Sequence, residues 1–374
     1  MTLLQEPAAL KKTPLYDRHV ALGGKIVNFG GWALPVYYES LLTEHRWTRE
    51  HCGLFDVSHL GEILVEGPGA FQFLQYRLTN DLRKLEEGKI IYSLLLDERG
   101  RTLDDILIYG SRPGSYYLIV NASNIARDME ALKKYAPEDA RLVDLSDQMA
   151  CIAVQGPKAE TVLEKLFGFT LQALPYYHWK EERFQGETVW VSRSGYTGED
   201  GFEIFSKNEL APAIWDRLNT DGRAEGVKPA GLGARNTLRL EAGNVLYGNE
   251  LDETTTPLEA GLKFAVSFEK GGFVGRDLLM VQNERGPARL LVGFKVLDKA
   301  IAREHYPIYG GGHKIGSVTS GSFGPTANAN IGMGYVERKF AVPGTTIEIE
   351  IHGRRIPAEV VKRPFVTKNH KKGL

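Results

Sequence analysis

The sequence predicts an α+β fold with two to three domains. Strand-like runs bounded by turn residues alternate with stretches of helical spacing over most of the 374 residues. After about Asn283 the pattern changes to short β segments alone. A chain of this length usually divides into more than one domain, because single hydrophobic cores stop growing before they reach it.

The clearest local element is a β-hairpin followed by a helix. Residues 105–109 (DILIY) and 116–120 (YYLIV) flank a turn-forming segment, GSRPGS, at 110–115. A helix is expected from about residue 125 to 135. Asn121 and Ser123 precede it and offer side chains that could cap its first N–H groups.

A second hairpin and a second helix follow in the middle of the chain. Residues 188–194 and 202–206 are joined by GYTGEDG at 195–201, whose glycines permit left-handed turn geometry. Helical spacing runs from about 232 to 241, and Gly243 is a candidate stop.

The C-terminal part predicts a small β-barrel. Its strand-like segments at 290–296, 315–319, 346–351 and 358–361 are separated by Gly, Pro and Asn. Turn signals alone suggest earlier domain joins near Val57 and Leu145.

Composition excludes several classes of partner. The 46 basic and 47 acidic residues give a net charge of -1, so no general affinity for nucleic acid is expected. No run of about 18 apolar residues predicts a membrane span, and the first residues lack the apolar core of a secretory signal. The only cysteines, Cys52 and Cys151, form no C-x-x-C. A reducing compartment is therefore expected: the cytoplasm, or the mitochondrial matrix if the source is a eukaryote.

Common catalytic signatures are missing from the sequence. It contains no G-x-x-x-x-G-K-[ST] phosphate loop, no G-x-S-x-G elbow and no H-E-x-x-H. Gly231 begins a G-L-G-A-R-N segment, but Asn236 takes the third glycine position of a dinucleotide loop. The nine histidines lack metal-ligand spacing, so no metal is implied.

Two neighbouring aspartates open the strand of the first hairpin. Strand side chains alternate between faces, so Asp104 and Asp105 should point in opposite directions. One of them could stabilise a cation in a water-poor site, and the competing interpretation is a turn cap or a solvated strand end.

Glu203 should share a strand face with Phe205, while Phe202 and Ile204 take the other face. A buried carboxylate needs a partner with parallel N–H donors, such as a heterocycle edge or an arginine. An internal salt bridge or a face open to water explains the pattern equally simply.

Further polar and aromatic residues leave both structural and functional interpretations open. Arg235 and Arg239 lie four residues apart on one helix face. One of them could bind a carboxylate ligand, or both could have a structural role. The tyrosines beside glycine-containing segments, Tyr92, Tyr196 and Tyr247, suit packing against a ligand or ordinary packing. From the residues alone, His59 has no interpretation.

These segments closely resemble the aminomethyltransferase (T protein) family of the glycine cleavage system. The resemblance runs nearly end to end. It includes DVSH at 56–59, LDDI at 103–106, GYTGEDGFEI at 195–204, GLGARNTLRLEAG at 231–243 and LYGNELDETTTP at 246–257. The ordered set is specific where any single segment would be weak.

The resemblance implies a three-domain cloverleaf with a C-terminal β-barrel. Residues 1–56 plus 145–282 would form a folate-binding α+β core domain, 57–144 a second α+β domain with the catalytic aspartate, and 283–374 the barrel. Carried over by position, Asp105 resembles the catalytic aspartate and Glu203 the pterin-binding glutamate. The positions of Tyr92, Tyr196, Asn121 and Arg235 resemble those that line the ligand.

The resemblance also implies the chemistry and the partners. Tetrahydrofolate would be the co-substrate, and the lipoylated H protein of the glycine cleavage system would deliver the aminomethyl group, with the P and L proteins as indirect partners. Asp105 would stabilise positive charge developing on the transferred carbon or position a folate nitrogen.

Two relatives of the same fold are the competing interpretations. A folate-dependent demethylase would need neither a lipoyl carrier nor ammonia release. The folate-binding iron–sulfur assembly factor carries a cysteine in K-G-C-Y-x-G-Q-E, whereas residues 270–277 here read KGGFVGRD.

The chain departs from its own family at Leu60, usually Met, and at Asn236, usually Asp, which makes the role of Arg235 less secure than that of Glu203. Residues 369–371 lack the aromatic seen near a ligand in some members.

Overall fold

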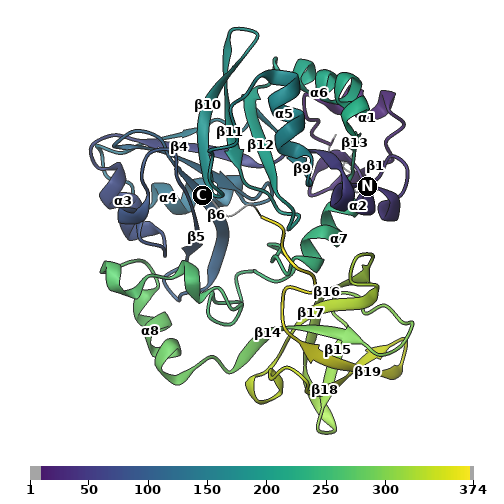
Figure 1. The fold of residues 1–374 in the computed structure, drawn as a ribbon. Coiled ribbons are helices and arrows are strands. Elements are labelled where there is room, and N and C mark those ends of the chain that lie inside the picture. The colour runs from purple at the N-terminus through teal and green to yellow at the C-terminus, as the bar shows by residue number, and fades with distance from the viewer. Residues whose placement is uncertain (1–9, 371–374) are drawn as a thin grey trace, which may run out of the picture.

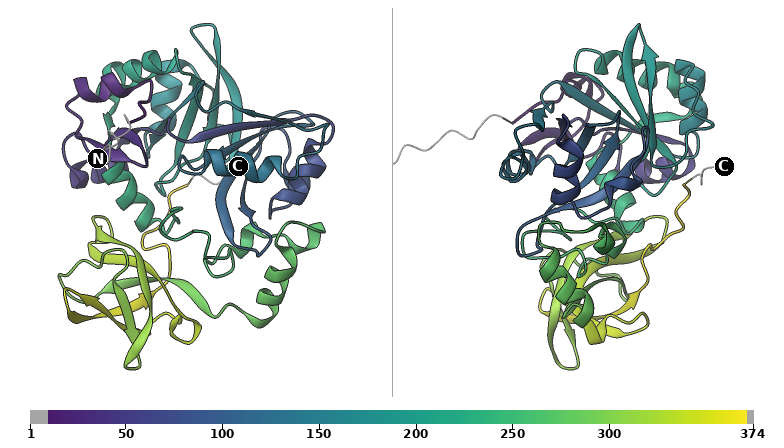
Figure 2. Two further views of the ribbon diagram at one scale, coloured as in Figure 1. Left: turned by 180° about the vertical axis from the view of Figure 1, so that it is seen from behind. Right: turned by 90° about the vertical axis from the view of Figure 1, so that its left-hand side faces the viewer.

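The structure, a computed structural model, describes residues 10–370 and contains two main sheets and a barrel (Figures 1 and 2). The expected lack of a secretory signal concerns a segment that begins outside the described residues. The first sheet has six strands, in which only β13 and β3 pair in parallel. In order across the sheet they are β10 (His178–Phe184), β11 (Glu187–Arg193), β12 (Gly201–Lys207), β9 (Met149–Gln155), β3 (Cys52–Asp56) and β13 (Val227–Pro229).

The second sheet has five antiparallel strands. They are β5 (Ile90–Leu96), β6 (Thr102–Gly110), β7 (Ser115–Val120), β4 (Gly61–Glu66) and β8 (Arg141–Asp144). The third unit is a closed barrel of six strands, which lies apart from the two sheets in Figure 1. Its strands are β14 (Arg289–Val296), β17 (Ala329–Glu337), β16 (His313–Gly324), β15 (Pro307–Gly310), β18 (Thr346–Ile351) and β19 (Arg354–Val361).

Helices cover the sheets and connect the units. Apolar residues of α5 and α6 join the core of the first sheet, and those of α3 and α4 join the core of the second. The helices are α1 (Tyr16–Ala21), α2 (Leu41–Glu50), α3 (Ala70–Arg77), α4 (Ile125–Lys133), α5 (Ala159–Phe167), α6 (Ala211–Thr220), α7 (Leu232–Glu241) and α8 (Arg276–Arg285). The short elements are β1 (Ile26–Phe29), β2 (Trp32–Pro35), η1 (Leu82–Lys84), η2 (Asp221–Glu225), η3 (Lys263–Ala265), η4 (Phe268–Lys270) and η5 (Arg338–Phe340).

The structure confirms the α+β class, both hairpins and the C-terminal barrel. The predicted strands of the hairpins are β6 with β7 and β11 with β12, each pair antiparallel. The predicted helix over 232–241 is α7, and Gly243 follows it with a φ of 67°. Strands β15 and β17 of the barrel were not predicted.

The predicted start of the helix at about residue 125 is confirmed, but the predicted cap was wrong. The helix after the first hairpin begins at Ile125, and no side chain caps it. The side chain of Asn121 turns back toward Asp104 and Asp105 instead, and that of Ser123 bonds to Asn124.

The predicted domain joins coincide with changes of sheet. The chain passes from the first sheet to the second between β3 and β4, and returns between β8 and β9. The predicted start of the last domain at 283 falls inside α8, and the first barrel strand begins at Arg289. The division into three domains with these bounds stays a prediction.

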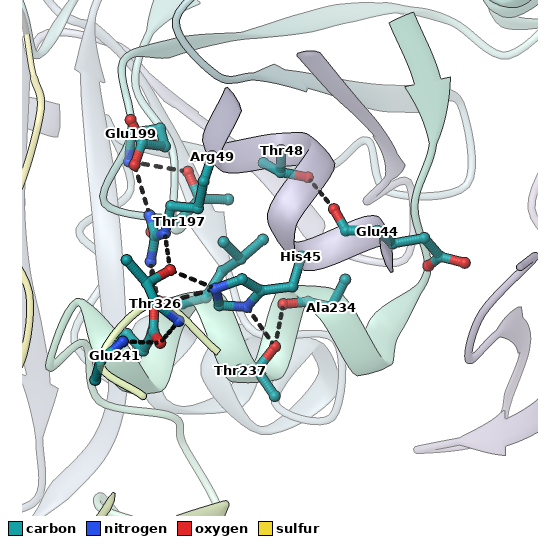
Figure 3. A network of polar contacts seen from close by, with 12 residues as sticks. Glu44, His45, Thr48, Arg49, Thr197, Glu199, Ala234, Thr237, Glu241 and Thr326 are labelled. Carbon is teal, nitrogen blue, oxygen red and sulfur yellow. Dashed lines mark hydrogen bonds and ion pairs between the residues drawn. The ribbon is translucent and has the colours of Figure 1, made fainter. Parts of the chain in front are cut away.

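A buried polar network holds the barrel against α2 and α7 (Figure 3). Glu241 Oε1 accepts the N–H groups of Thr326 and Ala327, which lie on the loop between β16 and β17, at 2.7 and 3.0 Å. Glu241 Oε2 lies 3.1 Å from both His45 Nε2 and a terminal nitrogen of Arg49. Helix α2, helix α7 and the β16–β17 loop of the barrel therefore meet at one carboxylate.

Within residues 10–370, no helix combines the length and the apolar character that crossing a membrane would require.

Candidate active site at the junction of the two sheets

A cavity of about 360 Å³ opens where β5 and β6 of the second sheet meet β12 and α7. All six residues singled out from the sequence line it. They are Tyr92, Asp105, Asn121, Tyr196, Glu203 and Arg235. Residues more than 140 positions apart in the chain thus meet at one place.

Asp105 occupies the cavity face of β6, opposite Leu94 of β5. Its carboxylate accepts hydrogen bonds from the hydroxyl of Tyr92 at 2.9 Å and from Asn121 Nδ2 at 3.0 Å. Burial, and then the neighbouring charge of Asp104, raise the pKa of Asp105 to about 7. The group therefore changes charge near neutral pH, which suits a residue that exchanges protons or meets a cation.

Asp104 lies on the opposite face of β6, as strand alternation predicts. It is fully buried and accepts three N–H groups from Asn121 and Asn124. The competing interpretations, a turn cap and a solvated strand end, do not describe either aspartate, because both are held inside the fold by side-chain donors.

Glu203 lies on β12 and is only 6% exposed. Phe202 and Ile204 point into the core of the first sheet, so alternation turns Glu203 toward the cavity. Among residues 10–370, its carboxylate accepts one hydrogen bond, from the Ser194 hydroxyl at 2.5 Å, and no cation lies within ion-pairing distance. Burial raises the pKa of Glu203, and the nearby charge of Arg235 partly offsets the rise.

The two arginines of α7 have different surroundings. Arg239 is buried and fully engaged by Glu250, Asn236 and Ser320. Arg235 lines the cavity with its guanidinium 4.7 Å from the ring centre of Tyr196. The departure at Asn236 thus affects Arg239, whose Nε donates to Asn236 Oδ1 at 2.8 Å.

The tyrosines form apolar walls with polar ends. Tyr92 stacks on the exposed Phe264, with ring centres 5.8 Å apart and planes inclined by 22°. The Tyr196 hydroxyl donates to the carbonyl of Val245. Tyr247 also lines the cavity and carries the Arg127 guanidinium 5.0 Å from its ring centre.

Sequence reasoning assigned no role to His59, Tyr177 and Ser194, which also line the cavity. His59 is 4% exposed and its Nδ1 has no hydrogen-bond partner within residues 10–370. Burial and the charge of Arg235 lower the pKa of His59 to about 4, so its ring is neutral at neutral pH. His59 ends the DVSH segment that supports the family resemblance, whereas neither spacing nor a motif separates Tyr177 and Ser194 from ordinary core residues.

A second cavity of about 490 Å³ meets the first at Asp105. Both are lined by Tyr92, Asp105, Tyr177, Gly195, Tyr196 and Val245. The second extends toward Phe264 and the basic residues Lys362, Arg363 and Lys368 of the C-terminal segment. Asp105 can therefore be approached from two sides.

Comparison with known proteins gives the same picture over the whole chain. Residues 15–270 match the model described as the GCVT N-terminal domain, and residues 289–367 match the glycine cleavage T-protein C-terminal barrel domain. The chain is 46% identical over 365 residues to an aminomethyltransferase of Caldanaerobacter subterraneus subsp. tengcongensis, covering 97% of this chain and 98% of the relative. It is 46% identical over 358 residues to an aminomethyltransferase of Geobacillus sp. (strain WCH70), covering 95% and 98%.

A solved structure is also similar throughout. The crystal structure of glycine cleavage system aminomethyltransferase T from Bartonella henselae matches with a TM-score of 0.92 and 38% identity, covering 97% of this chain and 100% of that one. The barrel, the two sheets and the order of the motifs thus agree with one family. This chain belongs to the glycine cleavage T-protein family of aminomethyltransferases.

Proposed function

We propose that this protein transfers the one-carbon unit of an aminomethyl-dihydrolipoyl H protein to tetrahydrofolate, with release of ammonia and formation of 5,10-methylenetetrahydrofolate. The observation that carries the proposal is the pair of carboxylates, Asp105 and Glu203, which line one cavity without any paired cation among the described residues. Buried carboxylates without counter-ions are costly, so such a pair suits a ligand that supplies donors and positive charge.

Glu203 fits the pterin ring of the folate. That ring presents a ring N–H beside an exocyclic amine, and a carboxylate accepts both in parallel. The Ser194 hydroxyl holds one oxygen of Glu203 and leaves acceptor capacity on both. Tyr196 and Arg235 offer flat faces beside it.

Asp105 fits the reacting carbon. Tetrahydrofolate supplies two nitrogen nucleophiles, and each gives up a proton as its bond to the carbon forms. The C–N bond to ammonia and the C–S bond to the lipoyl sulfur break, and the leaving nitrogen and sulfur each take up one of the two protons. Ionised Asp105 stabilises the positive charge that builds up on the carbon between these events. It can also carry a proton from a folate nitrogen, because its pKa is raised to about 7.

The two cavities fit a reaction between two large substrates. They meet at Asp105, so one reactant can occupy each cavity while the reacting atoms face the same carboxylate. The H protein is the direct partner in this proposal, and the P and L proteins act before and after it. We expect the protein to work in the cytoplasm, where the bacterial relatives that it resembles would also be found.

The test is ammonia release from an H protein loaded with the aminomethyl group, measured with and without tetrahydrofolate. We expect release that needs both this protein and folate, together with methylenetetrahydrofolate in the products. Folate binding without any ammonia release would overturn the proposal in favour of the demethylase, which would be assayed with a methylated substrate. The assembly-factor alternative has less support, because both cysteines of the chain are buried.

A further inference from the structure

A second pair of carboxyl groups lies directly behind Asp105, outside the cavity. Asp104 on β6 and Asp128 on α4 are both fully buried, and their carboxyl groups are within hydrogen-bond reach of each other. Two adjacent buried carboxylates cannot both stay ionised without a large electrostatic cost, so the pair should hold one proton.

The surrounding donors show which carboxyl group carries the negative charge. Asp104 accepts the Asn121 backbone N–H at 2.9 Å, Asn121 Nδ2 at 2.8 Å and Asn124 Nδ2 at 2.6 Å. Neither oxygen of Asp128 accepts a hydrogen bond from any donor within residues 10–370. Burial raises the pKa of both groups, and the three N–H donors oppose that rise at Asp104. At Asp128 the neighbouring charge of Arg127 opposes the rise, but burial and the charge of Asp104 still raise the pKa of Asp128 to about 11. The proton therefore belongs on Asp128.

The amide of Asn121 connects this pair to the active site. Its Nδ2 donates one N–H to Asp104 and the other to Asp105, at 2.8 and 3.0 Å. Ser123 donates to the amide oxygen of Asn124, which leaves the Asn124 nitrogen directed at Asp104. An amide has only two N–H groups, so both of those on Asn121 are committed to the two carboxylates.

We infer that Asp128 is a neutral carboxylic acid that donates its proton to Asp104, and that this pair, with one negative charge, positions Asn121 and Asp105 for the transfer reaction. Asp104 and Asp128 are positioning residues, because neither lines either of the two cavities that meet at Asp105. The inference deepens the proposed function and rests on it for its kinetic part.

The single charge behind Asp105 has a kinetic consequence. The groups that face Asp105 are Tyr92 from β5, Asn121 after β7, Tyr177 and Tyr196 from the first-sheet side, and Asp104 and Asp128 from behind. Of these, only Asp104 carries a charge at neutral pH. Removing that charge should lower the pKa of Asp105 and keep Asp105 ionised at lower pH.

Two variants separate the charge from the hydrogen bond. In Asp128→Asn the new amide N–H still donates to Asp104, so the negative charge stays where it is. In Asp104→Asn with Asp128→Asn together, the pair has no charge, while Asn121 keeps an acceptor at position 104. The measurement is the pH profile of kcat/KM for ammonia release, whose acid limb reports the ionisation of the free enzyme.

We expect the acid limb of Asp128→Asn to keep its wild-type position, and that of the double variant to move to lower pH by about one unit or more. A limb that moves equally in both variants would place the charge on Asp128 and overturn the inference. A limb that moves in neither would show that Asp105 does not sense the pair.

An infrared difference spectrum tests the pair without any activity. At neutral pH, the wild-type protein minus Asp128→Asn should show a protonated-carboxyl C=O band, and no change in the ionised carboxylate bands. Loss of carboxylate bands without a protonated-carboxyl band would show that both carboxyl groups are ionised in the wild type, and would overturn the inference. This readout stands even if the double variant does not fold or if the chain transfers no aminomethyl group, so failure of the inference and failure of the proposed function remain distinguishable.

Discussion

Charged side chains are buried both in the contact of the barrel with α2 and α7 and in the central cavity. The two places differ in the partners that these side chains have. In the contact with the barrel (Figure 3), Glu241 is matched by Arg49, His45 and two backbone N–H groups. Two residues before Glu241 on α7, Arg239 pairs with Glu250 at 2.8 Å. In the cavity, Glu203 and Arg235 line the same space without forming an ion pair, and Asp105 has only neutral donors.

This difference separates residues of the scaffold from residues of the site. A buried ion pair whose hydrogen bonds are all formed holds two units of the fold in one arrangement. It has no unused hydrogen-bonding capacity for a ligand. A buried charge with unused hydrogen-bonding capacity is tolerated where a ligand completes it. Variants in the contact should therefore cost stability, whereas variants in the cavity should cost binding or turnover.

The largest effect is expected for Arg239→Met. It leaves Glu250 buried without its cation, and breaking a buried pair in this way costs about 3–5 kcal/mol in the free energy of unfolding. Urea unfolding followed by circular dichroism measures the loss. A second substitution, Glu250→Gln, should recover part of it, because the stranded charge is gone. A loss below about 1 kcal/mol would place this pair with exposed ones and remove the contrast with the cavity.

Asp105→Asn should lower turnover by about 10²-fold or more, as removal of a single catalytic charge does, with little change in stability. The wild-type profile adds a test by pH. Because the pKa of Asp105 is raised to about 7 and the ionised form is the active one, kcat/KM should fall as the pH drops below that value. Near-normal turnover in Asp105→Asn would remove this residue from the mechanism and leave Glu203 as the only functional carboxylate of the cavity.

Glu203→Gln should weaken folate binding by about 10- to 100-fold, which corresponds to about 1.5–3 kcal/mol for hydrogen bonds to a charged group. The amide can accept only one of the two pterin N–H groups and turns a donor toward the other. Glu62→Gln is the control, because Glu62, like Glu203, is buried without an ion-pair partner in the described chain but does not line the cavity. Equal losses in the two variants, measured by isothermal titration with tetrahydrofolate, would refute a specific role for Glu203.

The elements that were predictable from the sequence are those with a local signal. Period-two alternation and turn residues locate β6, β7, β11 and β12, and helical spacing with a glycine stop locates α7. Strand β17 was missed because glycines interrupt its pattern. A side chain at Gly332 would meet the ring of Phe294, its partner on the neighbouring strand β14, at 2.4 Å, so this glycine is required by packing between strands, which no local pattern reveals.

For the site, the sequence supplied residue types and the family resemblance supplied positions. Alternation predicts that Asp104 and Asp105 diverge, but which of them lines the cavity depends on the face of β6 that α4 covers. The hydrogen bonds of Asn121 to both aspartates could not be predicted for the same reason. As a residue before a helix it looks like a cap, and only the tertiary structure places both carboxylates next to its amide.

The smallest effect is expected for Glu187→Gln, which tests the comparison from the side of the solvent. Glu187 pairs with Lys207 at 2.9 Å, about the distance between Arg239 and Glu250, but the two side chains are 52% and 66% exposed. Water and salt screen such a pair, so its loss should leave the free energy of unfolding nearly unchanged, and any small difference should vanish at high salt. Folate binding and turnover should be unaffected. A loss of stability close to that of Arg239→Met would mean that pairing, and not burial, determines how much an ion pair contributes to stability in this fold. The contact with the barrel and the cavity would then differ only in ligand binding.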